Sequence, residues 1–206
     1  MEGTLEEVDI DGMSHLVSER ALKGDTVLLN MGPQHPSTHG VLRLLLELDG
    51  ETVLNCVPDI GFLHTGVEKN MESKTYQKAE VMTDRLDYLS SMSNNFGYVM
   101  AVEKLMGVKP PDRAEYLRVI MAEMTRISNH LMAIGALLND LGAYFTPVLY
   151  GLEERELILD LFEEITGSRM MTNYCRFGGV ARDITDDQLA RIRRLVEDRF
   201  PRKVDD

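Results

Sequence analysis

Cysteine, tryptophan and other aromatic residues are scarce in this chain. Its 206 residues include two cysteines, Cys56 and Cys175, and no tryptophan, and 6% of the residues are aromatic. Two cysteines so far apart in the sequence cannot form a disulfide framework or a cysteine-rich metal site. This cysteine usage fits a reducing, cytoplasm-like compartment.

Positive charge is also in short supply. The chain has 22 Lys and Arg residues against 34 Asp and Glu, a formal net charge of −12. Such a balance repels phosphate backbones and anionic lipids, so we expect no nucleic-acid partner. No apolar run approaches the roughly 20 residues of a membrane span, and the acidic N-terminus is unlike a secretory signal. Any association with a membrane is therefore expected to be peripheral, through partner proteins.

Apolar runs and turn residues divide the chain into three parts. Residues 1–24 are polar and acidic without a clear period, which predicts an acidic N-terminal arm, flexible or held by a partner. Residues 25–61 contain short apolar runs separated by turns, which predicts a small antiparallel β-sheet. Asp49-Gly50 lies between two of these runs and favours the positive φ angles of a type I′ turn, so it predicts a hairpin.

From residue 62 onward, apolar residues recur every three or four positions, which is typical of helices. Gly167 is expected to end one of them. The expected fold class is α+β, with the small sheet followed by a helix bundle over 62–206. Because the chain stops shortly after its last helix, we expect the bundle to be truncated at the C-terminus. The expected helices span 64–81, 84–106, 112–141, 152–165 and 186–199.

The segment MGPQHPSTHG at 31–40 is the most unusual part of the sequence. Its prolines fix φ and its glycines allow close backbone approach, so His35 and His39 would be held on a stiff frame. Imidazole titrates near neutral pH, so such a frame suits proton delivery. Alternatively, one or both histidines bond to the backbone and only lock the loop. His64, in GFLHTG, is either a third such imidazole or a residue at a helix entry.

Further candidate side chains lie in the helical part. Asp87 and Tyr88 are expected in the first turn of a helix, where a carboxylate is favourable because of the helix dipole and a tyrosine often only packs. Asp140 lies near the end of the long helix, where it is either solvated or buried against a partner. Taken alone, these residues define no self-sufficient catalytic constellation.

Several segments nevertheless follow one another in a specific order along the chain. In this order they resemble the 49-kDa subunit of respiratory complex I, from about Val27 to the last residue. The resemblance covers about the first half of that family's chain. The segments are GPQHPSTHGVLRLLLELDGE, GFLHTGVEK, YQKAEVMTDRLDYLSSMSNN, AVEKL, PPDRAEYLRVIMAEMTRISNHL, DLGA, ERE, ITGSRM and RFGGV.

That family is in turn similar to the large subunit of nickel–iron hydrogenases, which carries an Arg-x-Cys-Gly-x-Cys motif. This chain has Asp87 and Ser90 where the motif has its cysteines. A nickel site cannot form without such soft thiolate ligands. The resemblance therefore implies a hydrogenase-like fold without hydrogenase activity, and no metal bound by this chain.

In the complex I family, the cavity left by the absent metal holds a quinone headgroup. The resemblance implies that His39 and Tyr88 donate hydrogen bonds and protons to the quinone, and that Asp140 is the carboxylate paired with His39. His35 and His64 are expected to shape the cavity. Two-electron reduction of a quinone requires two protons, so well-placed donors lower its cost.

The resemblance also implies a proton-translocating NADH:quinone oxidoreductase that is active only as part of a multisubunit complex. The complex would lie at the cytoplasmic face of the cell membrane, held there by partner subunits. This chain would bind no cofactor, because its electrons would come from a tetranuclear iron–sulfur cluster in a partner subunit. Other implied partners are a 30-kDa-type subunit, a ferredoxin-like iron–sulfur subunit and a membrane subunit that forms the quinone channel.

Two alternatives stay open. The first is the equivalent subunit of a related complex that takes electrons from reduced deazaflavin or ferredoxin. The second is a non-catalytic, hydrogenase-like scaffold that only holds partners. The joint presence of His39, Tyr88 and Asp140 argues against the scaffold, because a scaffold needs none of them.

Overall fold

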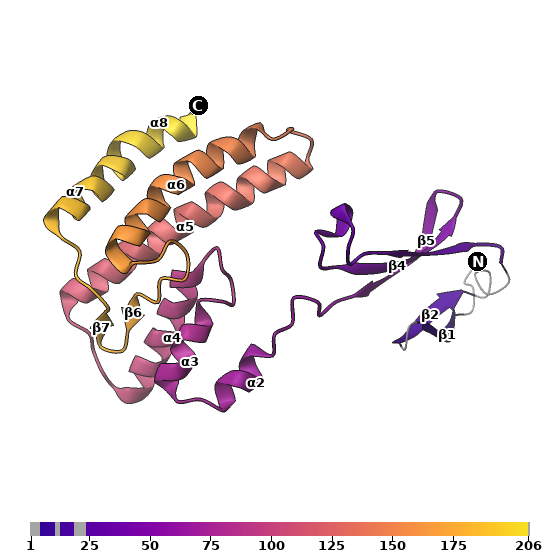
Figure 1. The fold of residues 1–206 in the computed structure, drawn as a ribbon, viewed down its shortest axis with the longest axis horizontal. Coiled ribbons are helices and arrows are strands. Elements are labelled where there is room, and N and C mark those ends of the chain that lie inside the picture. Colours follow the sequence, from indigo (N-terminus) through magenta and orange to yellow (C-terminus); the bar gives the residue numbers. More distant parts are fainter. Residues whose placement is uncertain (1–4, 11–12, 19–23, 206) are drawn as a thin grey trace. The chain divides into compact units, whose positions relative to one another are not determined.

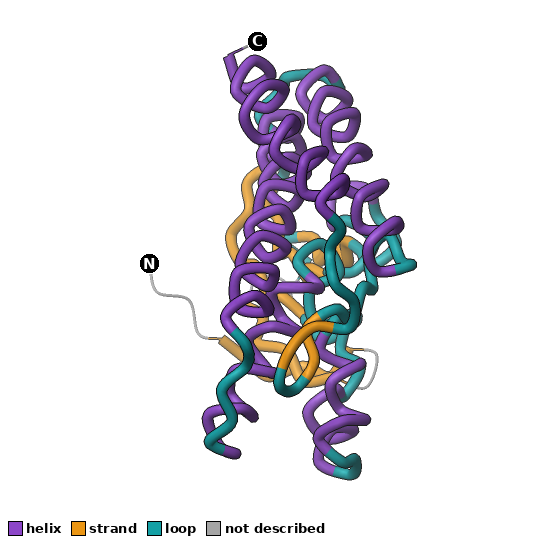
Figure 2. Tube along the Cα trace, turned by 90° about the vertical axis from the view of Figure 1, so that its left-hand side faces the viewer, coloured by secondary structure: helices purple, strands orange, loops and turns teal. Residues whose placement is uncertain are grey.

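The chain folds into two compact units, Met1–Gly66 and Val67–Asp206. The computed structural model describes residues 5–10, 13–18 and 24–205, and for the first two ranges it describes only the course of the backbone. Strands make up the first unit and helices most of the second (Figures 1 and 2). This confirms the expected α+β class, a small antiparallel sheet followed by helices.

The first unit contains an N-terminal hairpin that the apolar pattern does not predict. Strands β1 (Leu5–Ile10) and β2 (Met13–Ser18) pair antiparallel, within the stretch expected to be an arm without regular structure. The remaining residues of that stretch, 1–4, 11–12 and 19–23, lie outside the described part. A two-stranded ribbon needs no continuous apolar stripe, so hydrophobic periodicity does not signal it.

A three-stranded antiparallel sheet follows, with strand order β3 (Val27–Met31), β4 (Arg43–Asp49) and β5 (Thr52–Asp59). The central strand β4 buries a face that is partly charged, because Arg43 and Glu47 flank Leu45 there. Both charged side chains have polar partners. Arg43 donates to Asn30 Oδ1 at 2.9 Å, and Glu47 accepts from the Thr26 hydroxyl at 3.2 Å.

The predicted hairpin between β4 and β5 is confirmed, but its turn differs from the prediction. Asp49 pairs with Thr52, so the two-residue loop is Gly50-Glu51. Only Gly50 has positive φ, at 61°. A type I′ turn requires positive φ at both central positions, whereas a type II′ turn requires it only at the first. The single positive φ fits the type II′ pattern.

The second unit is built from helices with one small strand pair between them (Figure 1). Its first helices are α2 (Val67–Glu72) and α3 (Tyr76–Thr83). The bundle consists of α4 (Ser91–Met106), α5 (Asp112–Asp140) and α6 (Thr146–Thr166). The chain then forms β6 (Cys175–Arg176), β7 (Gly179–Val180), α7 (Asp186–Arg194), a π-helical turn at Leu195–Arg199, and α8 (Phe200–Asp205).

Two helix boundaries differ from the prediction. The helix expected from residue 84 begins only at Ser91, because Asp87 accepts a hydrogen bond from the Leu89 amide at 3.0 Å and holds the preceding residues in turns. The helix expected from Leu152 begins earlier, at Thr146. Pro147 stands in its first turn, where a missing amide hydrogen costs nothing. Gly167 ends this helix as expected, with φ 86°.

The hydrophobic core of the second unit lies between α4, α5 and α6 and extends to β6 and α7. Its completely buried side chains come from segments distant in sequence, namely Met92, Val99, Met121, Ile158, Tyr174 and Cys175. A buried ion pair crosses this core, in which Arg118 of α5 binds both carboxylate oxygens of Glu103 of α4 at 2.9 and 2.6 Å. Arg118 also donates to the carbonyls of Arg176 and Gly179. It thereby ties two bundle helices to the β6–β7 turn.

Candidate functional site

The histidine loop at 31–40 is a tightly hydrogen-bonded connection between β3 and β4. A single 3₁₀ turn at Pro36–Thr38 forms its centre. The Thr38 side chain is buried, and its hydroxyl donates to the carbonyl oxygens of His35 at 2.9 Å and Pro33 at 3.2 Å. The stiff frame predicted from the prolines and glycines is therefore present.

The two histidines of this loop have different roles in the structure. His35 Nδ1 accepts a hydrogen bond from the Ser37 amide at 3.1 Å, which caps the 3₁₀ turn. This backbone contact is the one that the alternative interpretation expects, in which His35 locks the loop. His39 ends the same turn in the left-handed conformation, with φ 54°, and its ring is exposed. The exposed His39 imidazole is therefore accessible to a ligand.

His64 lies in the segment that leads from the sheet to the first helix. Its amide donates to the Gly61 carbonyl at 2.7 Å, and its side chain is exposed. Helix α2 begins three residues later, at Val67. The interpretation as a residue near a helix entry agrees with this position, and a role in shaping a cavity stays a prediction.

Tyr88 stands on a series of turns between α3 and α4, rather than in the first turn of a helix. Its side chain is 57% exposed, and that of Leu86, two residues earlier, is 56% exposed. The Asp87 carbonyl accepts from the Ser90 amide at 3.1 Å and from Asn94 Nδ2 at 3.2 Å. The segment 85–90, which we call the Tyr88 turn, is therefore a defined structure that presents its phenol to the outside.

Buried polar groups anchor both ends of the Tyr88 turn. On the N-terminal side, Asp84 is 1% exposed, and its Oδ2 accepts a hydrogen bond from the backbone amide of Asn173 at 2.8 Å. On the C-terminal side, the Ser91 hydroxyl donates to the carbonyl of Met170, and Ser90 Oγ accepts from Asn129 at 2.5 Å. The segment 170–173 thus holds the turn at both ends.

Asp84 belongs to a buried acidic cluster that the local sequence pattern does not reveal. Glu80, 2% exposed, accepts from Arg176 at 2.9 Å. The side-chain amide of Asn173, in the orientation that satisfies its neighbours, donates to Glu80 at 2.8 Å and accepts from Arg176 at 3.1 Å. Burial raises the pKa of both carboxyls, that of Asp84 to about 6. The sequence carries no local signal for this cluster, because its partners lie almost a hundred residues apart.

Asp140 is the last residue of α5, and its carboxylate is exposed. In the preceding residue, Asn139, the Oδ1 atom accepts a hydrogen bond from the Phe145 amide at 3.0 Å, which closes the connection to α6. Of the two interpretations of Asp140, the structure of this chain supports the solvated one. Its pairing with His39 stays a prediction, because the two residues belong to different units.

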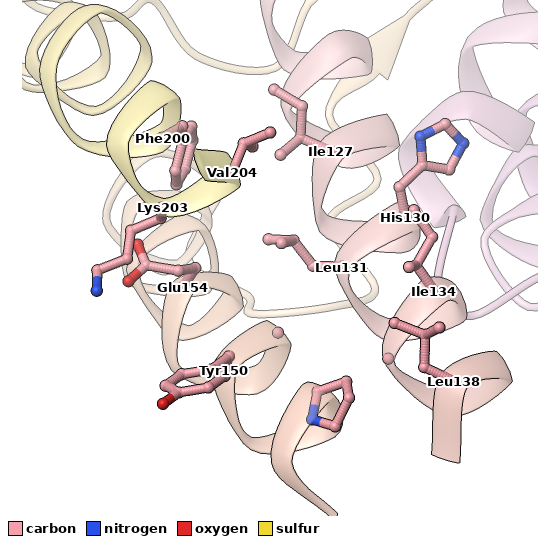
Figure 3. Close-up of a pocket in the computed structure, with 13 residues that line it drawn as sticks. Ile127, His130, Leu131, Ile134, Leu138, Tyr150, Glu154, Phe200, Lys203 and Val204 are labelled. Carbon is pink, nitrogen blue, oxygen red and sulfur yellow. The ribbon is translucent and has the colours of Figure 1, made fainter. Parts of the chain in front are cut away.

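An apolar cavity of about 530 Å³ lies between α5, α6 and α8 (Figure 3). Leu131 and Ile134 of α5 face Tyr150 of α6 across it, as Figure 3 shows. Glu154 also lines the cavity, and its carboxylate is bound by Arg199 at 2.7 and 2.8 Å, so it is not free for chemistry. None of the predicted site residues lines this cavity, so it is not the candidate site.

Neither a metal site nor a membrane-spanning helix is found among the described residues. Within residues 5–10, 13–18 and 24–205, no three His, Cys, Asp or Glu side chains are grouped as a metal site would require. In the same ranges, no helix is long and apolar enough to cross a bilayer. The predicted donors lie on separate units, His39 on the first and Tyr88 on the second, while Asp140 ends α5. That they belong to one site stays a prediction.

The sequence of this chain is similar to that of known proteins. Residues 140–206 match the family model described as the 49 Kd subunit of respiratory-chain NADH dehydrogenase. This match confirms, over residues 140–206, the resemblance carried by the sequence motifs.

Curated relatives, each of them a subunit of an NADH-quinone oxidoreductase, extend the similarity over most of the chain. The relative from Roseiflexus sp. is 59% identical over 170 residues, covering 82% of this chain and 40% of that protein. The relative from Chloroflexus aurantiacus is 54% identical over 182 residues, 87% of this chain and 44% of that protein. The relative from Sinorhizobium medicae is 56% identical over 186 residues, 90% of this chain and 46% of that protein. The chain thus spans less than half the length of these relatives.

Proposed function

We propose that this chain supplies part of the quinone-reducing site of a complex I-type NADH:quinone oxidoreductase. His39 and Tyr88 donate hydrogen bonds and protons to the quinone headgroup, and Asp140 is the carboxylate paired with His39. His35 and His64 shape the surroundings. The observation that carries the proposal is the Tyr88 turn, which is anchored by buried groups yet presents a phenol that is 57% exposed.

The chemistry requires donors of this kind. A quinone that accepts two electrons must also accept two protons to become a quinol. Donors held in place before the reaction stabilise the developing negative charge on the two carbonyl oxygens without reorganising. The histidine loop meets this requirement because its 3₁₀ turn is closed by Thr38 and His35. A carboxylate behind His39 would orient the imidazole and stabilise its protonated form.

The remaining parts of the reaction belong to partner subunits in this proposal. Electrons arrive from a tetranuclear iron–sulfur cluster in a neighbouring subunit, and this chain binds no cofactor itself. The partners are that iron–sulfur subunit, a 30-kDa-type subunit, a ferredoxin-like iron–sulfur subunit and a membrane subunit that forms the quinone channel. They hold the chain at the cytoplasmic face of the membrane, and charge changes near Asp140 couple quinone reduction to proton translocation.

The names of the relatives favour this proposal over its alternatives. The relatives quoted above are NADH-quinone oxidoreductase subunits, which supports NADH as the electron source over deazaflavin or ferredoxin. A pure scaffold would have no need for an exposed phenol on a turn with buried anchors at both ends. The proposal therefore makes Tyr88 its central residue.

Replacing Tyr88 by phenylalanine in the assembled complex tests the proposal directly. We expect Tyr88→Phe to lower quinone turnover about 10²-fold or more, because one proton donor is lost. The iron–sulfur centres should still be reduced at the normal rate. Turnover is measured with a soluble quinone, and cluster reduction by electron paramagnetic resonance.

The matched control is Tyr116→Phe, which removes a phenol that is 74% exposed on α5. This variant should keep normal turnover. Unchanged turnover in Tyr88→Phe would overturn the assignment and favour the scaffold.

A further inference from the structure

We propose that Asp84 is a proton-controlled positioning residue that holds the Tyr88 turn closed when protonated and favours its release when ionised. This inference rests on the proposed function only for its consequence at the quinone, because the turn itself is a feature of this chain. Asp84 contacts neither quinone nor reacting atoms in this proposal. It acts through the segment that carries Tyr88.

The first argument is the position of the carboxyl. Asp84 directly precedes the Tyr88 turn and is 1% exposed. Its Oδ2 accepts a hydrogen bond from the backbone amide of Asn173 at 2.8 Å. Its other oxygen, Oδ1, is buried without a hydrogen-bond partner among the described residues. A carboxylate in this setting has lost its water and regained one hydrogen bond, which leaves much of its charge unsatisfied.

The second argument is the charge around it. On α3, Glu80 is buried beside Asp84 and adds negative charge. On β6, Arg176 adds positive charge, but it also binds Glu80 at 2.9 Å. Arg85, next in the chain, is exposed, and its positive charge lowers the pKa of Asp84 more than that of Arg176 does. The buried Cys175 thiol is neutral, and the charge of Asp84 helps to raise its pKa. Asp84 therefore faces one buried carboxyl and two guanidiniums, of which Arg85 is exposed to water and Arg176 is bound to Glu80. Burial outweighs their charge and favours the protonated form of Asp84.

The third argument is thermodynamic linkage. Burial raises the pKa of Asp84 from its ordinary value of 3.8 to about 6. When the turn opens and exposes Asp84 to water, the carboxyl regains its ordinary affinity for protons. Between pH 3.8 and about pH 6, the closed form therefore binds more protons than the open form, and rising pH favours opening. From pH 5 to pH 7.5 the opening equilibrium should increase about tenfold.

Hydrogen exchange of the full chain without quinone tests the proposal. After correction for intrinsic rates, protection of the amides in residues 85–90 should fall about tenfold from pH 5 to pH 7.5. Asp84→Asn cannot ionise and should show no such dependence. Asp183→Asn, which removes an exposed carboxylate bound to Arg113, should keep it. Constant protection in the unaltered chain, or a persistent pH dependence in Asp84→Asn, would overturn the proposal.

A second variant covers the case in which Asp84→Asn does not fold. Glu80→Gln removes the neighbouring negative charge, so the transition in protection should move to lower pH. A transition that stays in place would contradict the proposal. Because exchange is measured without quinone, this result is separate from the turnover of Tyr88→Phe. An unaffected Tyr88→Phe enzyme would overturn the proposed function and leave the proton-controlled turn standing.

Discussion

Gly32 shows how much one residue contributes to the histidine loop. It has φ 90°, and a Cβ placed on it would lie 2.1 Å from the carbonyl oxygen of Leu42. The hydroxyl of Thr38 fills the same space, at 2.8 Å from that Cβ position. A backbone oxygen cannot move aside as a side chain can, so glycine is required here both for conformation and for space.

Substitution of this glycine should disorder the loop that presents His39. We expect Gly32→Ala to destabilise the β3–β4 pair by about 3 kcal/mol or more, since backbone clash and left-handed strain add. Hydrogen exchange of the β4 amides in the full chain measures the effect. Gly40→Ala is the control, because Gly40 also has positive φ, 78°, but a Cβ there meets nothing within 4 Å. It should cost only about 1 kcal/mol, and an equal cost in both variants would contradict the steric argument.

Residues 84–91 show where local sequence is a poor guide to a functional segment. Apolar spacing favoured a helix there, yet Asp87 binds the Leu89 amide and keeps the chain in turns. Short polar side chains compete with helical hydrogen bonds in this way. Tyr88 is therefore exposed on turns and not on a helix.

The packing of α5 against α6 depends on small residues at the element scale. A Cβ on Gly151 of α6 would lie 2.4 Å from the carbonyl oxygen of Leu131 on α5. A Cβ on Gly135 of α5 would lie 3.1 Å from the carbonyl oxygen of Pro147. The two helix backbones therefore approach closely at two points.

Alanine at this helix crossing should push the helices apart. We expect Gly151→Ala to destabilise the second unit by about 1–3 kcal/mol, despite the higher helix propensity of alanine. Urea unfolding followed by circular dichroism gives the free energy. Gly97→Ala, at an exposed helical position with nothing within 4 Å of the new Cβ, should instead stabilise by up to about 1 kcal/mol. If both variants were stabilised, the close contact would not exist.

Two buried acidic groups give the whole molecule opposing responses to pH. Burial alone would raise the pKa of Glu103, but hydrogen bonds from Arg118 and from the Gly178 amide hold it below its ordinary value. Glu103 therefore adds stability that is lost as pH falls below its usual range. Asp84 behaves oppositely, because its raised pKa gives stability that is present at low pH and lost as pH rises through about 6.

The response of Asp84 should be visible in global stability. The free energy of unfolding of Asp84→Asn, relative to the unaltered chain, should increase by about 1.4 kcal/mol from pH 5 to pH 7.5. Any constant cost of the amide cancels in this comparison. Urea unfolding at the two pH values provides the measurement. A difference between the chains that does not change with pH would show that Asp84 carries the same charge in both states.

Much of the fold follows from local pattern. The β4–β5 hairpin follows from Asp49-Gly50 between apolar runs, the long helix α5 from its apolar stripe, and the end of α6 from Gly167. These features depend on hydrogen bonds and φ angles of residues close in sequence, so composition and spacing are sufficient to predict them. The family resemblance and the candidates His39, Tyr88 and Asp140 also came from motifs.

The support of the candidate site depends on tertiary contacts instead. Asp84 meets Asn173 across 89 positions, and Glu80 meets Arg176 across 96. No local pattern separates these carboxylates from solvated ones, because their properties come from the loss of water when α3, α4 and the 170–176 segment pack together. The candidate donors could thus be recognised in the sequence, whereas the burial that raises the pKa of Asp84 exists only once the chain is folded.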